Sequence, residues 1–281
     1  MSVSFKIDLT GKVAVITGAG GVLCSQFAND LSECGAKVAL LDLNYEAAEK
    51  VAEEIKSNGG FAKAYKANVL DKNIMLNVAT EVVSDFGQVD ILLNGAGGNN
   101  PKATTDKEYY EVGDLDSDTK SFFDLDASGV EFVFNLNFLG TLIPTQAFAS
   151  YMVEKGGNII NISSMNAYTP LTKIPAYSGA KAAISNFTQW LAVHFSKVNI
   201  RVNAIAPGFF STKQNASLLW NDDGTPTERT KKILAATPMG RFGEPSELTG
   251  ALLFLLNDEA ASFVTGVVIP IDGGFSAYSG V

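Results

Sequence analysis

Short apolar runs alternate with longer amphipathic segments along the chain. The segments have the 3.6-residue period of helices and include YEAAEKVAEEIKS, 72–86, 131–155 and 177–195. The apolar runs that separate them are KVAVIT, KVALLD, FAKAYKANV, VDILLN, NIINIS, RVNAIA and VVIPID. This alternation predicts an α/β fold, a single doubly wound Rossmann-type domain over residues 1–281. We expect a parallel seven-stranded sheet with helices on both faces.

The first strand leads into a glycine-rich turn and then into a helical pattern. The turn GAGGVLC contains Gly18, Gly20 and Gly21, and SQFANDLSECG follows it. In that order, backbone N–H groups and the positive end of the helix dipole face a pyrophosphate. The next strand ends in Asp42, which can accept from both ribose hydroxyls and would repel a 2′-phosphate. The pattern predicts a site for NAD(H) in preference to NADP(H), with an ordinary turn as the alternative.

A second group of residues follows the fifth apolar run. Ser164 ends NIINISS, Tyr177 lies thirteen positions later, and Lys181 is four residues further on in AYSGAK. A lysine ammonium on the same helix face favours the tyrosinate, so that Tyr177 could exchange a proton with an alcohol or ketone. The Ser164 hydroxyl could hold the substrate oxygen. The tyrosine and lysine alone are more typical of a helix surface pair; with the rest of the chain they predict an enzyme.

The chain resembles classical short-chain dehydrogenases/reductases over nearly its whole length. The matching segments, in the order usual for that family, are TGAGGVLC at 17–24, NGAG at 94–97, Asn137 in NLNFLG, Ser164, Tyr177 with Lys181, PG at 207–208 and DGG at 272–274. The resemblance implies that Tyr177 is the acid/base and that Asn137 completes a proton relay through water to Lys181. It also implies that Lys181 holds the nicotinamide ribose. By itself, Asn137 could equally be a helix-packing polar residue.

The same resemblance implies which residues bind the cofactor. They are Gly18, Gly20, Gly21, Val22, Leu23, Asp42, Leu43, Asn68, Val69, Asn94, Gly95, Ala96, Gly97, Tyr177, Lys181, Pro207, Gly208 and Phe210. The family usually has glycine at the positions of Val22 and Cys24. The larger side chains here affect how closely a pyrophosphate can pack against the turn. It often has aspartate at Asn68, where an asparagine carbonyl can accept the same bond from the adenine amino group.

Within the family, the chain is similar to the D-mannonate oxidoreductase (fructuronate reductase)-like branch. That branch interconverts D-mannonate and D-fructuronate. The similarity lies in GAGGNNP at 95–101, NISSMNAYTPLTKIPAYSGAKAAISNFTQWLAVHF at 161–195, NAIAPGFFSTKQN at 203–215, TPMGRFGEPSEL at 237–248 and DGGFSAYSGV at 272–281. It implies a hydroxyl-to-ketone interconversion on a small sugar acid. A gluconate-type or other polyol dehydrogenase is an alternative within the same chemistry.

The charge balance argues against several classes of partner and of protein. The formal net charge of −9 speaks against nucleic acid and anionic membranes as partners. A 3-ketoacyl-carrier reductase needs a basic patch for its acidic carrier, and both the net charge and the acidic region 111–126 speak against one. A non-catalytic dinucleotide-sensing protein needs only the nucleotide half of the site, so the complete set of predicted catalytic residues favours an enzyme.

Two polar segments, 98–130 and 208–230, interrupt the alternation on the predicted substrate side of the sheet. We expect substrate-side loops, although the first could equally be a solvated insertion. Asn99, Asn100 and Asn166 suit hydroxyl recognition, and Lys102, Lys173 and Lys213 could pair with a substrate carboxylate. Turn chemistry for the asparagines and solvation for the lysines are the alternatives.

The remaining reactive residues predict no further chemistry. Cys24 and Cys34 lie ten positions apart on one predicted helix, too far for a disulfide, and are expected to be reduced packing residues without a metal. His194 lies about 100° around the helix from Tyr177, so we expect it in the core or at a subunit contact. There is no apolar run of membrane-spanning length and no leader, which predicts a cytoplasmic protein. The apolar C-terminal FSAYSGV, with the family resemblance, predicts a homotetramer.

Overall fold

The computed structural model describes residues 5–212 and 216–280 of the chain. Its strands form one sheet in the order β3-β2-β1-β4-β5-β6-β7, and every neighbouring pair is parallel. The strands are β1 (Val13–Thr17), β2 (Lys37–Asp42), β3 (Ala62–Lys66), β4 (Ile91–Asn94), β5 (Gly157–Ile162), β6 (Ile200–Pro207) and β7 (Val268–Ile271). The predicted parallel seven-stranded sheet is confirmed.

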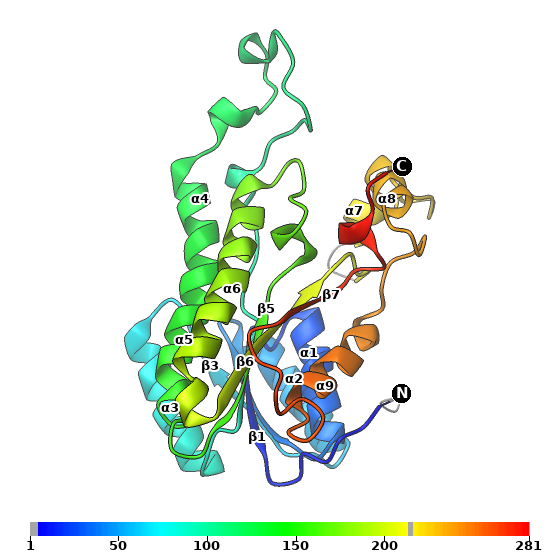
Figure 1. Ribbon diagram of the computed structural model, residues 1–281. Helices are drawn as coiled ribbons and strands as arrows, with labels where there is room; N and C mark the ends of the chain where they lie inside the picture. The colour runs from blue at the N-terminus through cyan, green and yellow to red at the C-terminus, as the bar shows by residue number, and fades with distance from the viewer. Residues whose placement is uncertain (1–4, 213–215, 281) are drawn as a thin grey trace.

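Helices cover both faces of this sheet (Figure 1). One face carries α1 (Val22–Glu33), α2 (Tyr45–Ser57) and α9 (Thr249–Leu256), and the other carries α3 (Lys72–Phe86), α5 (Gly140–Ala149) and α6 (Pro175–His194). Successive side chains of β1 pack alternately into the two cores, with Ala14 and Ile16 in one and Val13 and Val15 in the other. Burial on both faces explains why the strands are apolar throughout rather than alternating.

The helix predicted over 131–155 is divided, which corrects the sequence-based expectation. It consists of α4 (Ala127–Phe134), a π-helical turn (Asn135–Leu139) and α5. The Asn137 side chain donates to the carbonyl of Val133, at 2.8 Å, and to that of Gly98, at 2.8 Å. In a regular α-helix the Val133 carbonyl would accept only from a backbone N–H group, whereas here it also accepts from the Asn137 side chain. Single π-helical turns inside α-helices are frequent at functional sites.

The strand order reverses between β1 and β4, where a ligand crevice is expected in a doubly wound sheet. Thr17, the last residue of β1, lies beside Asn94, the last of β4. The Thr17 hydroxyl accepts hydrogen bonds from the backbone N–H groups of Gly95 and Ala96, at 3.1 and 3.2 Å. Thr17 thereby fixes the chain where it leaves β4.

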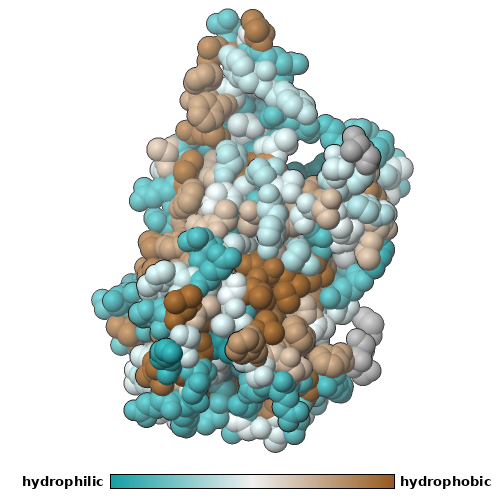
Figure 2. Space-filling model, viewed as in Figure 1, coloured by the Kyte–Doolittle hydropathy of each residue, from teal (hydrophilic) through white to brown (hydrophobic). Residues whose placement is uncertain are grey.

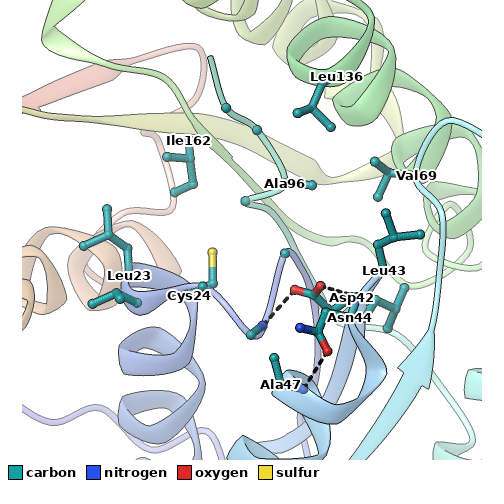
Figure 3. A pocket seen from close by; sticks show the side chains of 18 of the residues that line it. Leu23, Cys24, Asp42, Leu43, Asn44, Ala47, Val69, Ala96, Leu136 and Ile162 are labelled. Atoms are coloured by element: carbon teal, nitrogen blue, oxygen red, sulfur yellow. Dashed lines mark hydrogen bonds between the residues drawn. The ribbon is translucent and has the colours of Figure 1, made fainter. Parts of the chain in front are cut away.

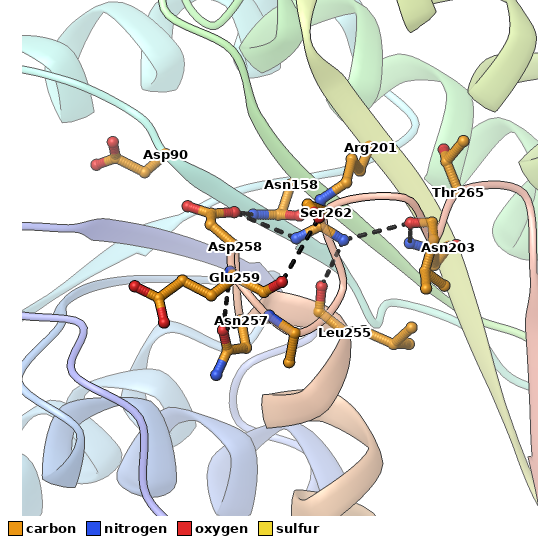
Figure 4. A network of polar contacts seen from close by, with 12 residues as sticks. Asp90, Asn158, Arg201, Asn203, Leu255, Asn257, Asp258, Glu259, Ser262 and Thr265 are labelled. Carbon is orange, nitrogen blue, oxygen red and sulfur yellow. Dashed lines mark hydrogen bonds and ion pairs between the residues drawn. The ribbon is translucent and has the colours of Figure 1, made fainter.

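A polar network holds the opposite edge of the sheet together (Figure 4). Arg201 on β6 donates to the carbonyls of Leu255 and Val264 and pairs with Asp258, at 3.2 Å. Asn158 on β5 also donates to Asp258. These bonds tie the segment after α9 to the neighbouring strands β5 and β6.

The two predicted substrate-side loops differ in structure. Residues 104–126 leave the body beyond η1 (Pro101–Ala103) and project past the N-terminal end of α4, and we call this segment the arm (Figure 1). The second segment contains α7 (Ala216–Leu219) and the start of α8 (Glu228–Ala235). Lys213 lies outside the described residues. Among the described helices, none is both long and apolar enough to cross a membrane.

Candidate active site

A cavity of about 920 Å³ opens at the carboxyl ends of β1, β2 and β4 (Figure 3). Most of the predicted cofactor residues line it, namely Gly18, Gly20, Gly21, Val22, Leu23, Asp42, Leu43, Asn68, Val69, Gly95, Ala96, Gly97, Tyr177, Lys181, Gly208 and Phe210. Two others, Asn94 and Pro207, are buried at the ends of their strands and do not line it. The Asn94 amide donates to Thr145 and Asn161, so it supports the site from within the core.

Several lining residues were missed by sequence reasoning. They are Cys24, Leu41, Asn44, Ala47, Ala67, Leu70, Gly98, Phe132, Leu136, Ile162, Phe209 and Thr212. Phe209 lies between Gly208 and Phe210, which were both predicted, so its position in the sequence was enough to predict it as well. Phe132 in α4 and Leu136 in the π-helical turn are four residues apart, and both lie on the cavity side of this helical segment. That spacing is visible in the sequence, but the direction in which this side points depends on the fold.

The glycine-rich turn fits a pyrophosphate. Gly18 has φ of +65°, and a Cβ there would lie 2.9 Å from the Ala96 backbone. A Cβ on Gly20 would lie 2.6 Å from the Ala47 side chain. Gly21 is the N-cap of α1 and supplies no side-chain cap, which leaves the first N–H groups of the helix available to an anion.

The Asp42 carboxylate is fixed at the cavity wall (Figure 3). One oxygen accepts from the backbone N–H of Gly20, at 2.9 Å, and the other from that of Asn44, at 2.8 Å. Each carboxylate oxygen has a further lone pair. This arrangement fits a ribose diol.

The structure also shows how the chain accommodates Cys24, where the family usually has glycine. The Cys24 sulfur occupies the space that a Cβ on Gly95 would need. Burial raises the pKa of the Cys24 thiol to about 12, so it stays protonated near neutral pH. Cys24 and Cys34 are both buried and free. Cys24 therefore packs against the β4 turn, and the missing side chain at Gly95 makes room for it.

Ser164, Tyr177 and Lys181 come together beside the cavity. Ser164 lies close enough to the Tyr177 hydroxyl to lower the pKa of that group. The Lys181 Nζ lies 5.6 Å from the centre of the Tyr177 ring and donates to the Ile162 carbonyl, at 2.8 Å. The three residues thus converge as the sequence predicted, from the end of β5 and the first turns of α6.

Their pKa values differ from the sequence-based expectation. Burial raises the pKa of Tyr177 to about 12, and the nearby Ser164 side chain offsets only part of this effect. Burial also lowers the pKa of Lys181 to about 8. The prediction that the lysine lowers the pKa of Tyr177 is wrong for the chain alone, because desolvation is the largest effect on both groups.

Asn137 and Lys181 meet at Gly97. Asn137 is fully buried in the π-helical turn, and its Oδ1 accepts from the backbone N–H of Gly98, at 3.3 Å. A Cβ placed on Gly97 would lie 2.7 Å from the Asn137 Oδ1 and 3.2 Å from the Lys181 Nζ. The two polar groups therefore flank the same point of the backbone, and a glycine is needed between them.

We expect Gly97→Ala to lower kcat by about a hundredfold, because an added methyl group displaces Asn137 and Lys181 by a fraction of an ångström. The measurement is steady-state turnover, with thermal unfolding to show that the variant folds. Gly98→Ala is the matched control, since its Cβ would meet only Leu136, at 3.5 Å, an ordinary contact. Equal effects of the two substitutions would contradict this account of Gly97.

The structure describes five of the six predicted substrate residues, and none of these lines the cavity: Asn99, Asn100, Lys102, Asn166 and Lys173. Asn99 donates to Thr104 and Asn100 accepts from the backbone of Lys102, so both serve the turn in which they lie. The Lys173 carbonyl accepts from Thr105 at the base of the arm. Asn166 differs from the others because it is buried next to Ser164 and its Oδ1 has no hydrogen-bond partner among the described residues.

His194 lies at the end of α6 and is exposed, which rules out the core alternative for the chain alone. Its ring stacks on Trp190 with 4.6 Å between centroids. The subunit-contact alternative stays a prediction. Within residues 5–212 and 216–280, no group of three or more His, Cys, Asp or Glu side chains is arranged to hold a metal ion.

A doubly wound sheet, a glycine cradle at its switch point and a Ser–Tyr–Lys group beside the cavity together define an oxidoreductase of the dinucleotide-binding type. A family model described as enoyl-(acyl carrier protein) reductase matches residues 19–276. The chain belongs to the short-chain dehydrogenase/reductase family.

Individual relatives cover nearly the full length of the chain. An uncharacterized oxidoreductase of Haemophilus influenzae is 64% identical over 282 residues, 100% of this chain and 99% of that protein. A solved structure provisionally named a D-mannonate oxidoreductase from Haemophilus influenza, with bound NAD, has 65% identity and a TM-score of 0.94, covering 98% of each chain. An NAD⁺-bound xylitol dehydrogenase has 30% identity and a TM-score of 0.81, covering 95% of this chain and 100% of that chain.

Proposed function

We propose that the protein is an NAD(H)-dependent dehydrogenase/reductase that interconverts D-mannonate and D-fructuronate. The observation that carries this proposal is the similarity to the NAD-bound structure named for D-mannonate, which extends over nearly the whole of both chains. The cavity geometry supports the cofactor, and the substrate is taken from that relative. The xylitol dehydrogenase supports a second candidate, a related polyol dehydrogenase.

In the proposed reaction, Tyr177 moves the proton. Its hydroxyl gives a proton to the ketone oxygen in the reductive direction and takes it from the alcohol in the oxidative one. Ser164, which lies beside the Tyr177 hydroxyl, would turn its own hydroxyl proton to the same substrate oxygen and orient it. Lys181 and Asn137 connect Tyr177 to solvent through water, and Gly97 leaves them the room to do so.

The residues of the cavity wall would hold the cofactor. The turn at Gly18, Gly20 and Gly21 would bind the pyrophosphate, and Asp42 the adenosine ribose. Lys181 would hold the nicotinamide ribose. The bound dinucleotide supplies or accepts the hydride. The carboxylate of Asp42 favours NAD(H) over NADP(H), because a 2′-phosphate beside it would be repelled.

Asn166 is the best supported of the proposed substrate residues. Its backbone N–H donates to the Ser164 hydroxyl, at 3.3 Å, so the two side chains have neighbouring positions. A buried amide oxygen that has no partner among the described residues costs about 1–3 kcal/mol, and a hydrogen bond from a substrate hydroxyl would offset this cost. We propose weaker roles for Asn99, Asn100 and Lys173, which lie on the same side of the sheet.

The substrate assignment is tested by comparing kcat/KM for D-mannonate, D-gluconate and xylitol with NAD⁺. We expect D-mannonate to be preferred at least tenfold over either of the other two compounds. Asn166→Ala should raise KM for D-mannonate with little change in the KM for NAD⁺. Preference for xylitol would favour the polyol dehydrogenase and remove the sugar-acid assignment.

The two directions of the reaction should depend differently on pH. Oxidation needs the deprotonated Tyr177 oxygen, whose pKa is raised to about 12, so kcat/KM for oxidation should increase as pH rises from about 7 to 10. Reduction needs the protonated form, which predominates over that whole range, so its kcat/KM should not increase. Initial rates in both directions measure this difference. Loss of the Lys181 charge, with a pKa lowered to about 8, acts on both directions, so oxidation and reduction that depend on pH in the same way would contradict the role of Tyr177.

We also propose that the protein is a cytoplasmic homotetramer. A groove between α5 and α6, lined by Leu142, Phe187, Trp190 and His194, is strongly apolar and supports burial against another subunit. Light scattering after gel filtration tests the assembly, and a monomer at micromolar concentration would remove it. Cell fractionation tests the location.

A further inference from the structure

The base of the arm is fixed to the segment that leads into α6. The backbone N–H of Thr105 donates to the Lys173 carbonyl, at 3.0 Å. Two residues further along the arm, the Lys107 ammonium donates to Asp114, at 2.7 Å, and the side chain of Asp114 is only 6% exposed. Glu108 comes directly after Lys107, so its place beside the N-terminal end of α6 is fixed by the fold of the arm.

Glu108 connects the arm to the opposite side of the active-site cavity. Its carboxylate accepts a hydrogen bond, at 2.7 Å, from the ammonium group of Lys232 on α8, 124 positions further along the chain. The cavity lies between these two sides, because Tyr177 of α6 lines it together with Thr212, which precedes α7. Figure 2 shows an opening between the part of the molecule that carries α6 and the arm and the lobe that carries α7 and α8. The ion pair therefore spans the entrance of the cavity.

The charges at this entrance do not balance. The hydrogen bond from Lys232 lowers the pKa of Glu108, and the charge of Lys173 lowers it further, so Glu108 is ionised and faces two lysines. The nearby Glu228 is paired with Lys231, at 2.6 Å. Lys173 forms no ion pair with any described residue. Two ammonium groups thus share one carboxylate, and a second carboxylate would balance them.

The proposed substrate would bring such a carboxylate to the entrance. In D-fructuronate the ketone lies near one end of the carbon chain and the carboxylate at the other. A ketone held by Ser164 and Tyr177 leaves the carboxylate to find its own partner, and a carboxylate is costly to bury without a cation. Lys173 lies four residues before Tyr177 in the chain. The lysines at the entrance are therefore suitably placed for the charged end of the substrate.

We propose that Lys232, assisted by Lys173, binds the carboxylate of the substrate, and that Glu108 takes that place while the substrate is absent. This inference rests on the proposed function, because it requires an anionic substrate. When the substrate binds, Lys232 exchanges the Glu108 carboxylate for that of the substrate. Lys232 thereby determines specificity, because it distinguishes a sugar acid from a neutral polyol, and Glu108 competes with the substrate for it.

The role of Lys232 is tested with Lys232→Gln on two substrates that differ only at the charged end. D-mannitol has a hydroxymethyl group where D-mannonate has its carboxylate. The variant should raise KM for D-mannonate about tenfold or more, the loss typical of one hydrogen bond between charged groups. KM for NAD⁺ and kcat/KM for D-mannitol should not change. Lys231→Gln is the matched control, because Lys231 is next to Lys232 on α8 and pairs with Glu228.

Two results of this comparison would overturn the proposal. One is an equal loss of kcat/KM for D-mannonate and D-mannitol in Lys232→Gln, because a structural role would affect both substrates. The other is an equal rise in KM for D-mannonate in Lys231→Gln, because any nearby positive charge would then suffice. Thermal unfolding of both variants shows whether each of them folds like the native chain.

Glu108→Gln separates recognition of the substrate from a contact that only holds the arm in place. Because Glu108 competes with the substrate, its neutral variant should lower KM for D-mannonate about twofold to fivefold, a change the size of a weak surface ion pair. Lys232→Gln should change KM in the opposite direction. A structural contact is lost in both variants, so a KM that rises or stays the same in Glu108→Gln would overturn the proposal.

The native chain distinguishes failure of this proposal from failure of the proposed function. A native chain that prefers D-mannitol or xylitol to D-mannonate would overturn both. A native chain that prefers D-mannonate, with a KM that Lys232→Gln leaves unchanged, would keep the proposed function and overturn only the role of Lys232.

Discussion

Replacing Tyr177 by phenylalanine is expected to lower kcat by about a hundredfold to ten-thousandfold, the range typical of removing a general acid/base. The substitution removes one oxygen atom and keeps the ring beside Lys181. Cofactor affinity should change little, because the cradle and Asp42 are untouched. Turnover and NAD⁺ binding by calorimetry are the measurements.

The control for this variant is Ser178→Ala, next along α6. Ser178 is buried and its hydroxyl has no hydrogen-bond partner among the described residues, so its removal should leave kcat within about twofold, a loss well below that of an essential acid/base. Turnover retained in Tyr177→Phe would remove Tyr177 as the acid/base. A loss of NAD⁺ binding in the same variant would instead show that the hydroxyl serves the cofactor.

Replacing Asp42 by serine should change the choice of cofactor. The variant loses acceptors for the ribose hydroxyls, each worth roughly 1–3 kcal/mol, so kcat/KM with NAD⁺ should fall about tenfold to a hundredfold. It also loses the charge that repels a 2′-phosphate, so kcat/KM with NADP⁺ should rise. The measurement is the ratio of kcat/KM with NAD⁺ to kcat/KM with NADP⁺, because a general loss of activity lowers both values equally and leaves the ratio unchanged.

Glu46→Ala provides the matched control for Asp42. Glu46 is an exposed acid in the first turn of α2, near Asp42 in sequence but absent from the cavity wall. Its removal should leave the ratio unchanged. If the Asp42→Ser ratio also stayed at the native value, the cofactor preference would have to arise elsewhere in the site.

The sheet could be predicted from the sequence because a parallel strand is buried on both faces and therefore appears as a short apolar run. The convergence of Ser164, Tyr177 and Lys181 could be predicted for a related reason. Parallel strands end at one edge, and the helix that follows β5 begins there. Asn137 was predicted as a member of the site from its place in the order of the family motifs.

Other features depend on contacts between distant segments. The π-helical turn involves hydrogen bonding between Asn137 and Gly98, which are far apart in the sequence. The pKa of Tyr177 depends on burial by surrounding segments, and the sequence spacing indicates only the neighbouring lysine. The long polar segment predicted a loop, but not a folded arm with buried Asp114 and exposed phenylalanines. Its aromatic residues were visible in the sequence, while their outward orientation was not.

The most direct test of the account is transfer of deuterium to D-fructuronate from NADH that carries deuterium at both C4 positions, followed by mass spectrometry of the product. The account predicts D-mannonate that carries the label on the reduced carbon, with Tyr177→Phe almost inactive. Unlabelled product, or no product from D-fructuronate while another ketone is reduced, would contradict the proposed reaction.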